Sequence, residues 1–570
     1  MLKSASGNRE SEKNRLSNSE NVKEIRHRIQ YIKNLKYINN DLFSDCGFQI
    51  LPSFRFSAWE VLQAVFLGVS LVQFMRCAGP AYVWVFVGLI VPLLRFGWSI
   101  DYRRRIWWRL RRVWTEVAAF ADLSHNPYVE RERITRKLPW RATALLVVLP
   151  AGLFFLSQGR PLMTGDSKPI TLIASALVRD GTTELSAFLP EYASVYRPDP
   201  ALELPYFCVR TTTGVYSSYP SGMFVFAVPS AALAQLLGAD LLSGGVQDRM
   251  EKGVASWLAA SCLGLFFLLA LHLADAASAA WMTLFLATGS GLCSTVGQAL
   301  WQHGGVLFWI LLALLIEFRT WQRPTLAGTI LQGVALAMML ACRLPSVLLI
   351  AAFGLWLLVR APRHAARVGL AAVLAYAPWA WYYGTTYGHV LGPSIRQLEM
   401  FTGRWRDTLV PLLLSTDHGL LIYQPWILLG LALLAPGVRR RLPTAPVDVP
   451  PGWHWLCIAV ITPYLVLVAS WYCWWGGQCW GSRLLVETVP FFALLCLPSV
   501  AALRQLTWGR RLLVATALLA SFVQLTGVYL KGDFRDTQPA LIGGAAPEPP
   551  GSWKHWPFLT PFVGALHGHR

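Results

Sequence analysis

Residues 304–359 read GGVLFWILLALLIEFRTWQRPTLAGTILQGVALAMMLACRLPSVLLIAAFGLWLLV, and this segment decides the fold class. It contains three apolar stretches, at 304–318, 325–342 and 344–359, separated by short connectors. A helix needs roughly 20 mostly apolar residues to cross a bilayer. Three stretches of nearly that length in immediate succession predict membrane-spanning helices joined by tight loops, and therefore an all-α polytopic membrane protein.

The composition of the whole chain favours the same class. Of its 570 residues, 54% are hydrophobic and only 14% are charged, with a mean hydropathy of +0.43. These values exclude a chain of several soluble domains. The formal charge is +19, from 50 basic and 31 acidic residues. In a membrane protein such an excess is typical of basic cytoplasmic loops, so we expect membrane lipids as partners and no nucleic acid.

Apolar stretches of about spanning length recur from residue 57 onward. There are thirteen candidate spans, at 57–75, 79–95, 141–157, 253–273, 278–298, 304–318, 325–342, 344–359, 367–383, 417–436, 453–472, 484–503 and 512–530. The prediction is a bundle of about thirteen transmembrane helices. A further apolar stretch, 222–238, contains a proline and follows a Tyr-Pro-Ser-Gly sequence. We expect it to lie in the membrane plane or to re-enter, because a full crossing would invert every later loop.

The positions of Lys and Arg predict the orientation of the bundle. Ten of them crowd the loop after the second span, between residues 103 and 137, which indicates that this loop is cytoplasmic. Four later groups then fall on the same side: Arg319 and Arg323; Arg360, Arg363 and Arg367; Arg439, Arg440 and Arg441; and Arg504, Arg510 and Arg511. We therefore expect a cytoplasmic amino terminus and an external carboxyl terminus.

The same pattern divides the chain into four parts. Residues 1–56 are expected to form a basic and largely disordered cytoplasmic extension, and 57–140 to hold two extra spans and a basic cytoplasmic loop. The main transmembrane domain is expected over 141–530, followed by an external tail at 531–570. A long external segment, from 159 to about 252, opens that domain, and large loops on one side of a helical bundle are where chemistry is expected.

The first external loop offers a carboxylate at Asp166, within the sequence MTGDSKP at 163–169. A carboxylate at the membrane surface can accept a proton from a hydroxyl group, which is the role of a general base. The alternative is a turn or helix-capping residue, since Gly-Asp-Ser is ordinary turn chemistry. Glu184 and Glu191 in the same loop are the reserve candidates for a base.

Two further polar features interrupt apolar sequence. Residues 294–305, STVGQALWQHGG, carry Gln302 and His303 at an expected external helix end. His303 is interpreted as a hydrogen-bond donor to phosphate or sugar, as a metal ligand, or as an ordinary contact between helices. Arg343 lies between two tightly linked spans, on the side that the other cations avoid. A cation there favours an anionic partner, and the alternative is a side chain that reaches the lipid headgroups.

A turn at 471–483, WYCWWGGQCWGSR, gathers four Trp, three Gly and one Arg at the external boundary. Aromatic faces such as those of Trp474 and Trp475 suit the apolar faces of sugar rings, and Arg483 suits a phosphate. The alternative is an interfacial aromatic belt.

Together these pieces resemble the GT-C superfamily of membrane glycosyltransferases, in particular bacterial relatives of protein O-mannosyltransferases and aminoarabinose transferases. The resemblance rests on TGDSKPITLIASALVRDGTTEL, the YPSG sequence before an in-plane helix, STVGQALWQHG, the RLPS junction, YYGTTYG, STDHGLLIYQP and WWGGQCWGSRLLVETVPF. It covers residues 141–505. It implies a GT-C-like bundle with a large external first catalytic loop.

The resemblance also implies roles for single residues. In that superfamily the loop aspartate deprotonates the acceptor, and Asp166 is the matching position. Basic residues hold the lipid-linked phosphate: Arg343 matches the junction residue, while Lys168 and Arg483 are candidates by position. Sugar or acceptor contacts are expected from Gln302, His303, Trp474, Trp475 and Tyr219. In that superfamily a second acidic residue commonly stands where this chain has Gln302 and His303, and this chain has no DxD sequence. We therefore expect no metal and no cofactor. A bound divalent cation is the alternative.

The implied reaction is the transfer of a sugar from a polyprenyl-phosphate donor to a glycan, lipid or protein acceptor, with inversion, at the external face of a bacterial inner membrane. A transporter or flippase of lipid-linked saccharides is the first alternative, because it also needs a polar cavity and cations. A polymerase or ligase of the O-antigen type, with a diphosphate-linked donor, is the second.

Overall fold

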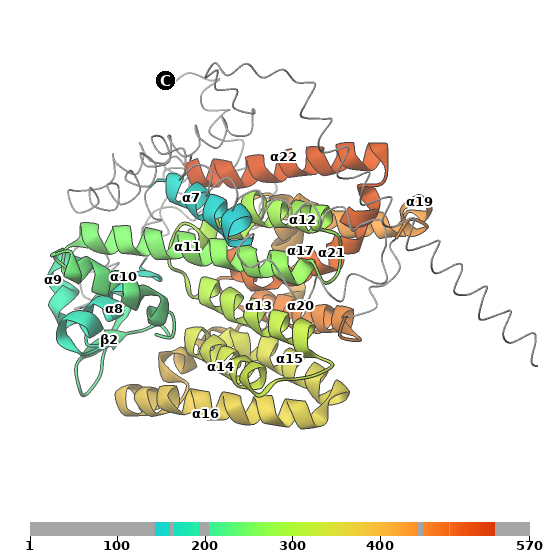
Figure 1. The fold of residues 1–570 in the computed structure, drawn as a ribbon. Helices are drawn as coiled ribbons and strands as arrows, with labels where there is room; N and C mark the ends of the chain where they lie inside the picture. Colours follow the sequence, from blue (N-terminus) through green and yellow to red (C-terminus); the bar gives the residue numbers. More distant parts are fainter. Residues whose placement is uncertain (1–142, 160–164, 193–203, 443–448, 478, 530–570) are drawn as a thin grey trace, which may run out of the picture. The chain divides into compact units, whose positions relative to one another are not determined.

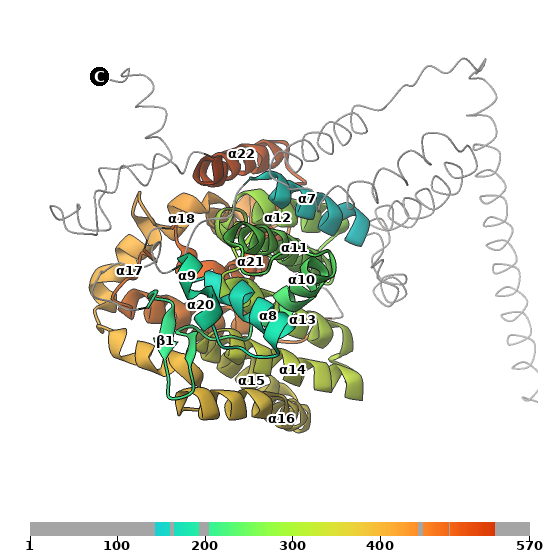
Figure 2. The ribbon, with the colours of Figure 1, turned by 90° about the vertical axis from the view of Figure 1, so that its left-hand side faces the viewer.

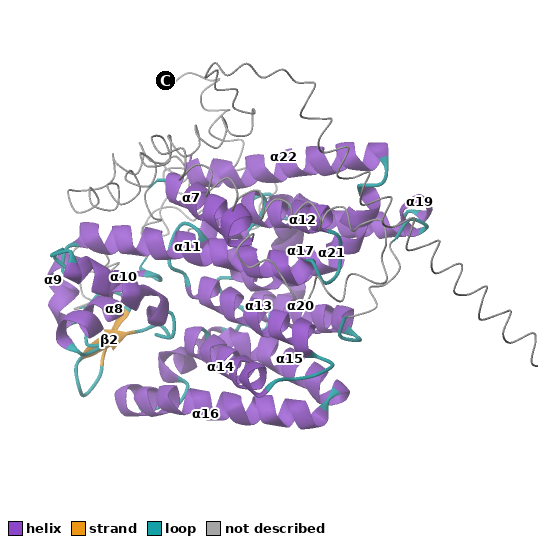
Figure 3. Cartoon of the chain, in the orientation of Figure 1, coloured by secondary structure: helices purple, strands orange, loops and turns teal. Residues whose placement is uncertain are grey.

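A computed structural model describes residues 143–159, 165–192, 204–442, 449–477 and 479–529 (Figure 1). The expected cytoplasmic extension at 1–56, the spans at 57–75 and 79–95 and the tail at 531–570 lie outside the described residues. Within the described part the chain is almost entirely helical, and one short hairpin is its only sheet (Figure 3). This confirms the all-α class.

The described residues between 168 and 236 build a small lobe, here called the α8–α10 lobe. The helices η3 (Ala144–Val148) and α7 (Leu149–Ser157) precede it. The lobe consists of α8 (Lys168–Asp180), η4 (Ser186–Phe188), α9 (Leu189–Tyr192), β1 (Cys208–Arg210), β2 (Val215–Ser217) and α10 (Phe224–Leu236). The two strands pair antiparallel with Val209 opposite Tyr216.

The remaining elements form the helical bundle. They are α11 (Gly244–Ala270), α12 (Ala276–Thr288), η5 (Leu292–Val296), α13 (Gln302–Thr320), α14 (Leu326–Cys342), η6 (Leu344–Ser346), α15 (Val347–Arg360), α16 (Pro362–Tyr387), η7 (Gly392–Met400), α17 (Trp405–Leu414), α18 (Leu420–Tyr423), η8 (Pro425–Leu434), α19 (Pro436–Arg439), α20 (Trp453–Ser470), η9 (Arg483–Thr488), α21 (Val489–Leu503) and α22 (Thr507–Tyr529).

Several of these helices have the length and composition of membrane spans. Five of the described helical segments qualify: Gly244–Ala270, Gln302–Thr320, Trp453–Ser470, Arg483–Leu503 and Thr507–Tyr529. Shorter apolar helices, of 10–17 residues, overlap further expected spans without reaching spanning length, among them Ala144–Ser157, Ala276–Thr288, Leu326–Cys342 and Leu344–Arg360. The chain is therefore a helical membrane protein. The count of thirteen stays a prediction.

The core of the bundle forms around α11 and α13. Both helices are apolar on nearly all sides, and most of each is buried among α7, α10, α12 and α14. Outer helices behave differently, since α15 and α16 expose large apolar side chains, including Val359, Leu370, Val373, Leu374 and Trp381. In Figure 2 α16 lies at the edge of the bundle, below α14 and away from α11. Exposed apolar side chains of this density are typical of a surface that faces lipid.

Polar contacts hold the α8–α10 lobe together. Gln247 at the start of α11 donates to the Ser175 hydroxyl, at 2.8 Å, and to the carbonyl of Leu241. α8 ends at Gly181, whose φ of 69° lies in the left-handed region that favours glycine.

The stretch expected in the membrane plane forms α10, whose 13 residues are too few to cross a bilayer. Its orientation in the membrane stays a prediction.

A buried carboxylate fixes the far end of α13. Glu317 is fully buried and accepts hydrogen bonds from Arg360, from Gln332 at 2.9 Å and from His364 at 3.3 Å. These partners lie on α14, α15 and α16, so a single charge ties four helices together. Glu317 is 15 residues from Gln302, or about 22 Å along the helix, and so belongs to the frame of the bundle.

Candidate functional site

Asp166 is the centre of a polar cluster made from distant parts of the chain. One carboxylate oxygen, Oδ1, accepts hydrogen bonds from the Tyr219 hydroxyl at 2.8 Å and the Tyr206 hydroxyl at 3.3 Å. The other oxygen, Oδ2, accepts from Nη1 of Arg483 at 3.0 Å. Gln302 donates to the backbone carbonyl of Asp166 at 2.9 Å. Four residues predicted from the sequence, Asp166, Tyr219, Gln302 and Arg483, therefore meet at one place.

A turn at the start of α8 holds Asp166. Residues 165–167 form a turn, and α8 begins directly afterwards with Pro169 in its first turn, where its missing amide proton costs nothing. The absence of a side chain at Gly165 leaves room for the phenol ring of Tyr206, which a Cβ there would force to shift. Asp166 is thus a turn residue and also the acceptor of three side-chain hydrogen bonds.

Arg483 reaches Asp166 from the glycine-rich turn. Gly476, Gly477 and Gly481 all have left-handed φ values, of 85°, 73° and 64°, so this turn depends on glycine. The guanidinium of Arg483 lies over the ring of Trp301, 4.0 Å from its centroid, and only 12% of the side chain is exposed. Trp301 therefore supports the cation from below by a cation–π contact. Trp301 belongs to the polar segment 294–305, and no role was predicted for it.

A second charged centre lies beside the first. Nη1 of Arg343 donates to both carboxylate oxygens of Glu487, at 3.0 and 3.1 Å, and to the Tyr464 hydroxyl at 2.6 Å. His303 Nδ1 is 3.0 Å from the same carboxylate, and it donates, because an ionised carboxylate only accepts. Glu487 is fully buried. The anionic partner expected for Arg343 is thus a residue of the chain itself.

Two helical segments join the centres. Gln302 and His303 are consecutive at the start of α13, and one contacts Asp166 while the other contacts Glu487. Arg483 and Glu487 likewise lie four residues apart at the start of the span Arg483–Leu503. Glu487 was missed from the sequence, although a lone carboxylate inside an apolar span is itself a signal of function.

Lys168 lies in a different environment from the other candidate cations. Its side chain is 1% exposed, and its ammonium group is paired with Glu251 at 2.6 Å and with Asp248. Burial opposes the charged form, but these two carboxylates outweigh it and raise the pKa of Lys168 above its usual range. With 1% of its side chain exposed, against 17% for Arg343 and 12% for Arg483, Lys168 is not favoured as a contact for a donor phosphate.

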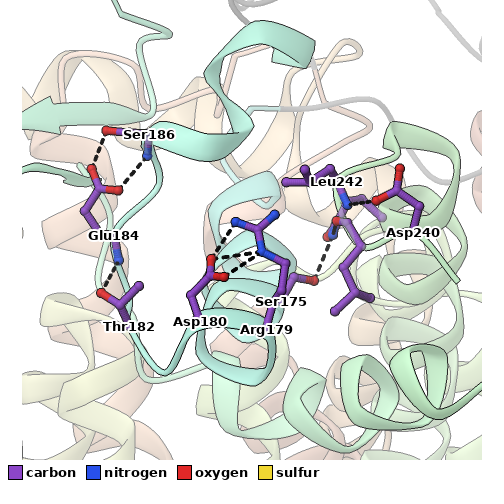
Figure 4. Close-up of polar contacts among 10 residues, drawn as sticks. Ser175, Arg179, Asp180, Thr182, Glu184, Ser186, Asp240 and Leu242 are labelled. Carbon is purple, nitrogen blue, oxygen red and sulfur yellow. Dashed lines mark hydrogen bonds and ion pairs between the residues drawn. The ribbon is translucent and has the colours of Figure 1, made fainter. Parts of the chain in front are cut away.

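The other predicted residues have structural contacts. Glu184 accepts from the backbone amides of Ser186, at 3.0 Å (Figure 4), and Val215, at 2.8 Å. Glu191 accepts from the amide of Gly244 at 3.2 Å. Both reserve candidates for the base therefore stabilise loops. Trp474 is buried and Trp475 partly buried, with their rings edge to face at 6.0 Å, and both pack against the core.

The electrostatics of the first centre favour a neutral phenol beside a charged pair. Burial and the nearby Asp166 raise the pKa of Tyr219 well above its ordinary value. Tyr219 therefore stays protonated and keeps donating to the carboxylate. Asp166 with Arg483, and Glu487 with Arg343, each form a pair of zero net charge.

Comparisons with known proteins add no further constraint. No family model, curated protein or solved structure matches this chain. Among the described residues there is also no group of three or more His, Cys, Asp and Glu side chains placed to hold a metal ion. The site is therefore characterised by its own geometry: a partly exposed carboxylate, two cations held by carboxylates, and hydroxyl groups of tyrosine. Such a site can accept a proton and stabilise an anion.

Proposed function

We propose that this chain is a GT-C-type glycosyltransferase that moves a sugar from a polyprenyl-phosphate donor to an acceptor hydroxyl at the external face of a bacterial inner membrane. The observation that carries the proposal is the convergence of Tyr219, Gln302 and Arg483 on Asp166. These residues come from four segments that are distant in sequence. A partly exposed carboxylate that is oriented by hydrogen bonds from several distant segments is typical of a reacting group.

In the proposed reaction Asp166 is the general base. The acceptor hydroxyl replaces one of the present donors on Oδ1, and Tyr206 is the donor that leaves, since its contact is the longest and its side chain is 40% exposed. The hydroxyl proton passes to Asp166 as the oxygen bonds to the anomeric carbon. The bond between that carbon and the phosphate oxygen breaks with its electron pair, so polyprenyl phosphate departs and the anomeric centre inverts.

The departing phosphate is assigned to Arg343 and Arg483. Their side chains are 17% and 12% exposed, and each is already oriented by a carboxylate. Fixed cations in a partly desolvated site stabilise developing charge without reorganisation. Lys168 is set aside in this proposal because it is buried between Glu251 and Asp248.

Arg343→Gln is expected to weaken use of the donor. The change removes a charge-assisted contact to the phosphate, worth roughly 1.5 to 3 kcal/mol, so kcat/KM for the donor should fall by about 10- to 150-fold. The dependence of the rate on acceptor concentration should stay close to that of the parent. Steady-state kinetics with purified protein measure the dependence of the rate on donor and on acceptor concentration. An unchanged kcat/KM for the donor would mean that Arg343 has only a structural role, as the partner of Glu487.

The proposed function is tested by transfer in the presence of EDTA. Both oxygens of Asp166 accept from protein donors, and hard divalent cations need several oxygen ligands, so we expect purified protein to form the glycosidic bond with the metal chelated. A flippase would form no glycosidic bond in detergent under any condition. Activity that is lost in EDTA and restored by Mg²⁺ or Mn²⁺ would keep the transferase and contradict metal independence. A diphosphate-linked donor as the sole active one would favour the polymerase or ligase.

A further inference from the structure

We infer that Glu251, on α11, is a positioning residue that holds the two halves of the Asp166 site in register. Glu251 is fully buried and belongs to no motif that suggested a function. The expected effect of Glu251 on the rate of transfer rests on the proposed function. Its structural role does not depend on that proposal.

Glu251 contacts the segment that carries Asp166. Oε1 of Glu251 accepts a hydrogen bond from the hydroxyl of Ser167, and Oε2 accepts from Nζ of Lys168 at 2.6 Å. These are the two residues that directly follow Asp166. Glu251 therefore fixes the start of α8 by hydrogen bonds immediately beside the proposed base.

Glu251 and its neighbour Lys252 also contact the segment that leads to Trp301 and Gln302. Oε1 of Glu251 also accepts from the backbone amide of Leu300 at 3.3 Å. The next residue on α11, Lys252, donates to the carbonyl of Gly297 and to the side chain of Gln298, both at 2.9 Å. Consecutive charged residues of one rigid helix thus fix residues 297–300.

The consequence is a shared anchor for groups that must face each other. Asp166 depends on the segment at 165–168, whereas the ring beneath Arg483 and the amide that donates to Asp166 depend on Trp301 and Gln302. One carboxylate is bonded to both segments, so their separation is set by α11. Misplacing a reacting group by about 1 Å can cost 10²-fold in rate.

Glu251→Gln keeps the size of the side chain and removes the charge. We expect kcat to fall by about 10- to 100-fold, with KM for the donor nearly unchanged, because the groups that bind the donor remain. Glu317→Gln is the matched control. Glu317 is equally buried and equally bonded, but it lies at the far end of α13, so kcat should stay near that of the parent.

A double variant, Lys168→Met with Glu251→Gln, separates positioning from simple charge burial. Glu251→Gln alone leaves the buried Lys168 with only Asp248 as a charged partner, so its Tm should fall. The double variant also removes the cation, so its Tm should return toward that of the parent. If Glu251 positions the site, kcat stays low despite this recovery. Recovery of kcat together with Tm would overturn the inference.

Hydrogen exchange provides a readout that does not need activity. In Glu251→Gln the amides at 165–168 and 297–302 should both exchange faster than in the parent, and in Glu317→Gln neither should change. Unchanged exchange in either segment would overturn the shared anchor. If the parent protein transfers no sugar, the proposed function fails, and the exchange comparison still decides whether Glu251 braces the two segments.

Discussion

Asp166→Asn should lower the rate of sugar transfer by roughly 10² to 10⁴-fold, the usual effect of losing general base assistance. Asparagine has nearly the same shape and still accepts from Tyr219 and Tyr206, but it cannot take the acceptor proton. The fold should persist, since the turn at 165–167 and the contact from Gln302 involve the backbone. The measurement is the initial rate with purified protein, together with Tm in detergent.

Asp240→Asn is the matched control for this variant. Asp240 is an exposed carboxylate of the same part of the chain, and it accepts from the backbone amide of Leu242 at 2.9 Å, a bond that asparagine can also accept. Its transfer rate should equal that of the parent. A rate within about twofold of the parent in Asp166→Asn would make Asp166 a turn residue only. Glu184 and Glu191 would then have to be tested as bases.

Glu487→Ala should destabilise the protein by about 3 to 5 kcal/mol, because removing one partner of a buried ion pair strands the other. Glu487 is fully buried, and its loss leaves Arg343 without its carboxylate and His303 without its acceptor. The expected result is a clear fall in Tm and in the yield of folded protein. This prediction depends on the packing alone and holds whatever reaction the chain performs.

The double variant Glu487→Ala with Arg343→Leu tests the cause of that loss. It removes both charges, so part of the stability should return even though the cavity left by the glutamate remains. Thermal unfolding in one detergent, at one protein concentration, compares the three proteins. A Glu487→Ala protein as stable as the parent would contradict the ion pair between Arg343 and Glu487.

The sequence predicted the helical elements more completely than it predicted the partners of charged groups. Apolar stretches specify helices by composition, so α13, α20 and α22 lie close to the expected spans, whereas α11 begins at Gly244, before the expected start at 253. The candidates around Asp166 were found because a carboxylate, a cation and a polar patch each stood out locally. Their meeting was not predicted from spacing, since 317 residues separate Asp166 from Arg483 along the chain.

Glu487, Glu251 and Trp301 were not singled out from the sequence because their contacts are made with residues distant along the chain. A buried charge is tolerated only when a partner neutralises it, and the partner of Glu487 is 144 residues away. The same reason explains Lys168, which looked like an available cation at a loop and is instead neutralised by two residues of α11. Which opposite charges meet is decided by how the helices pack, and a single sequence does not contain that information in readable form.

The consecutive contacts of Gln302 and His303 have a mechanical consequence. Successive residues of an α-helix point about 100° apart, so the first turn of α13 touches the Asp166 centre with one side chain and the Glu487 centre with the next. A rigid helix cannot rotate one of these side chains while the other stays still. A rotation of α13 about its axis would therefore move Gln302 relative to Asp166 and His303 relative to Glu487 at the same time.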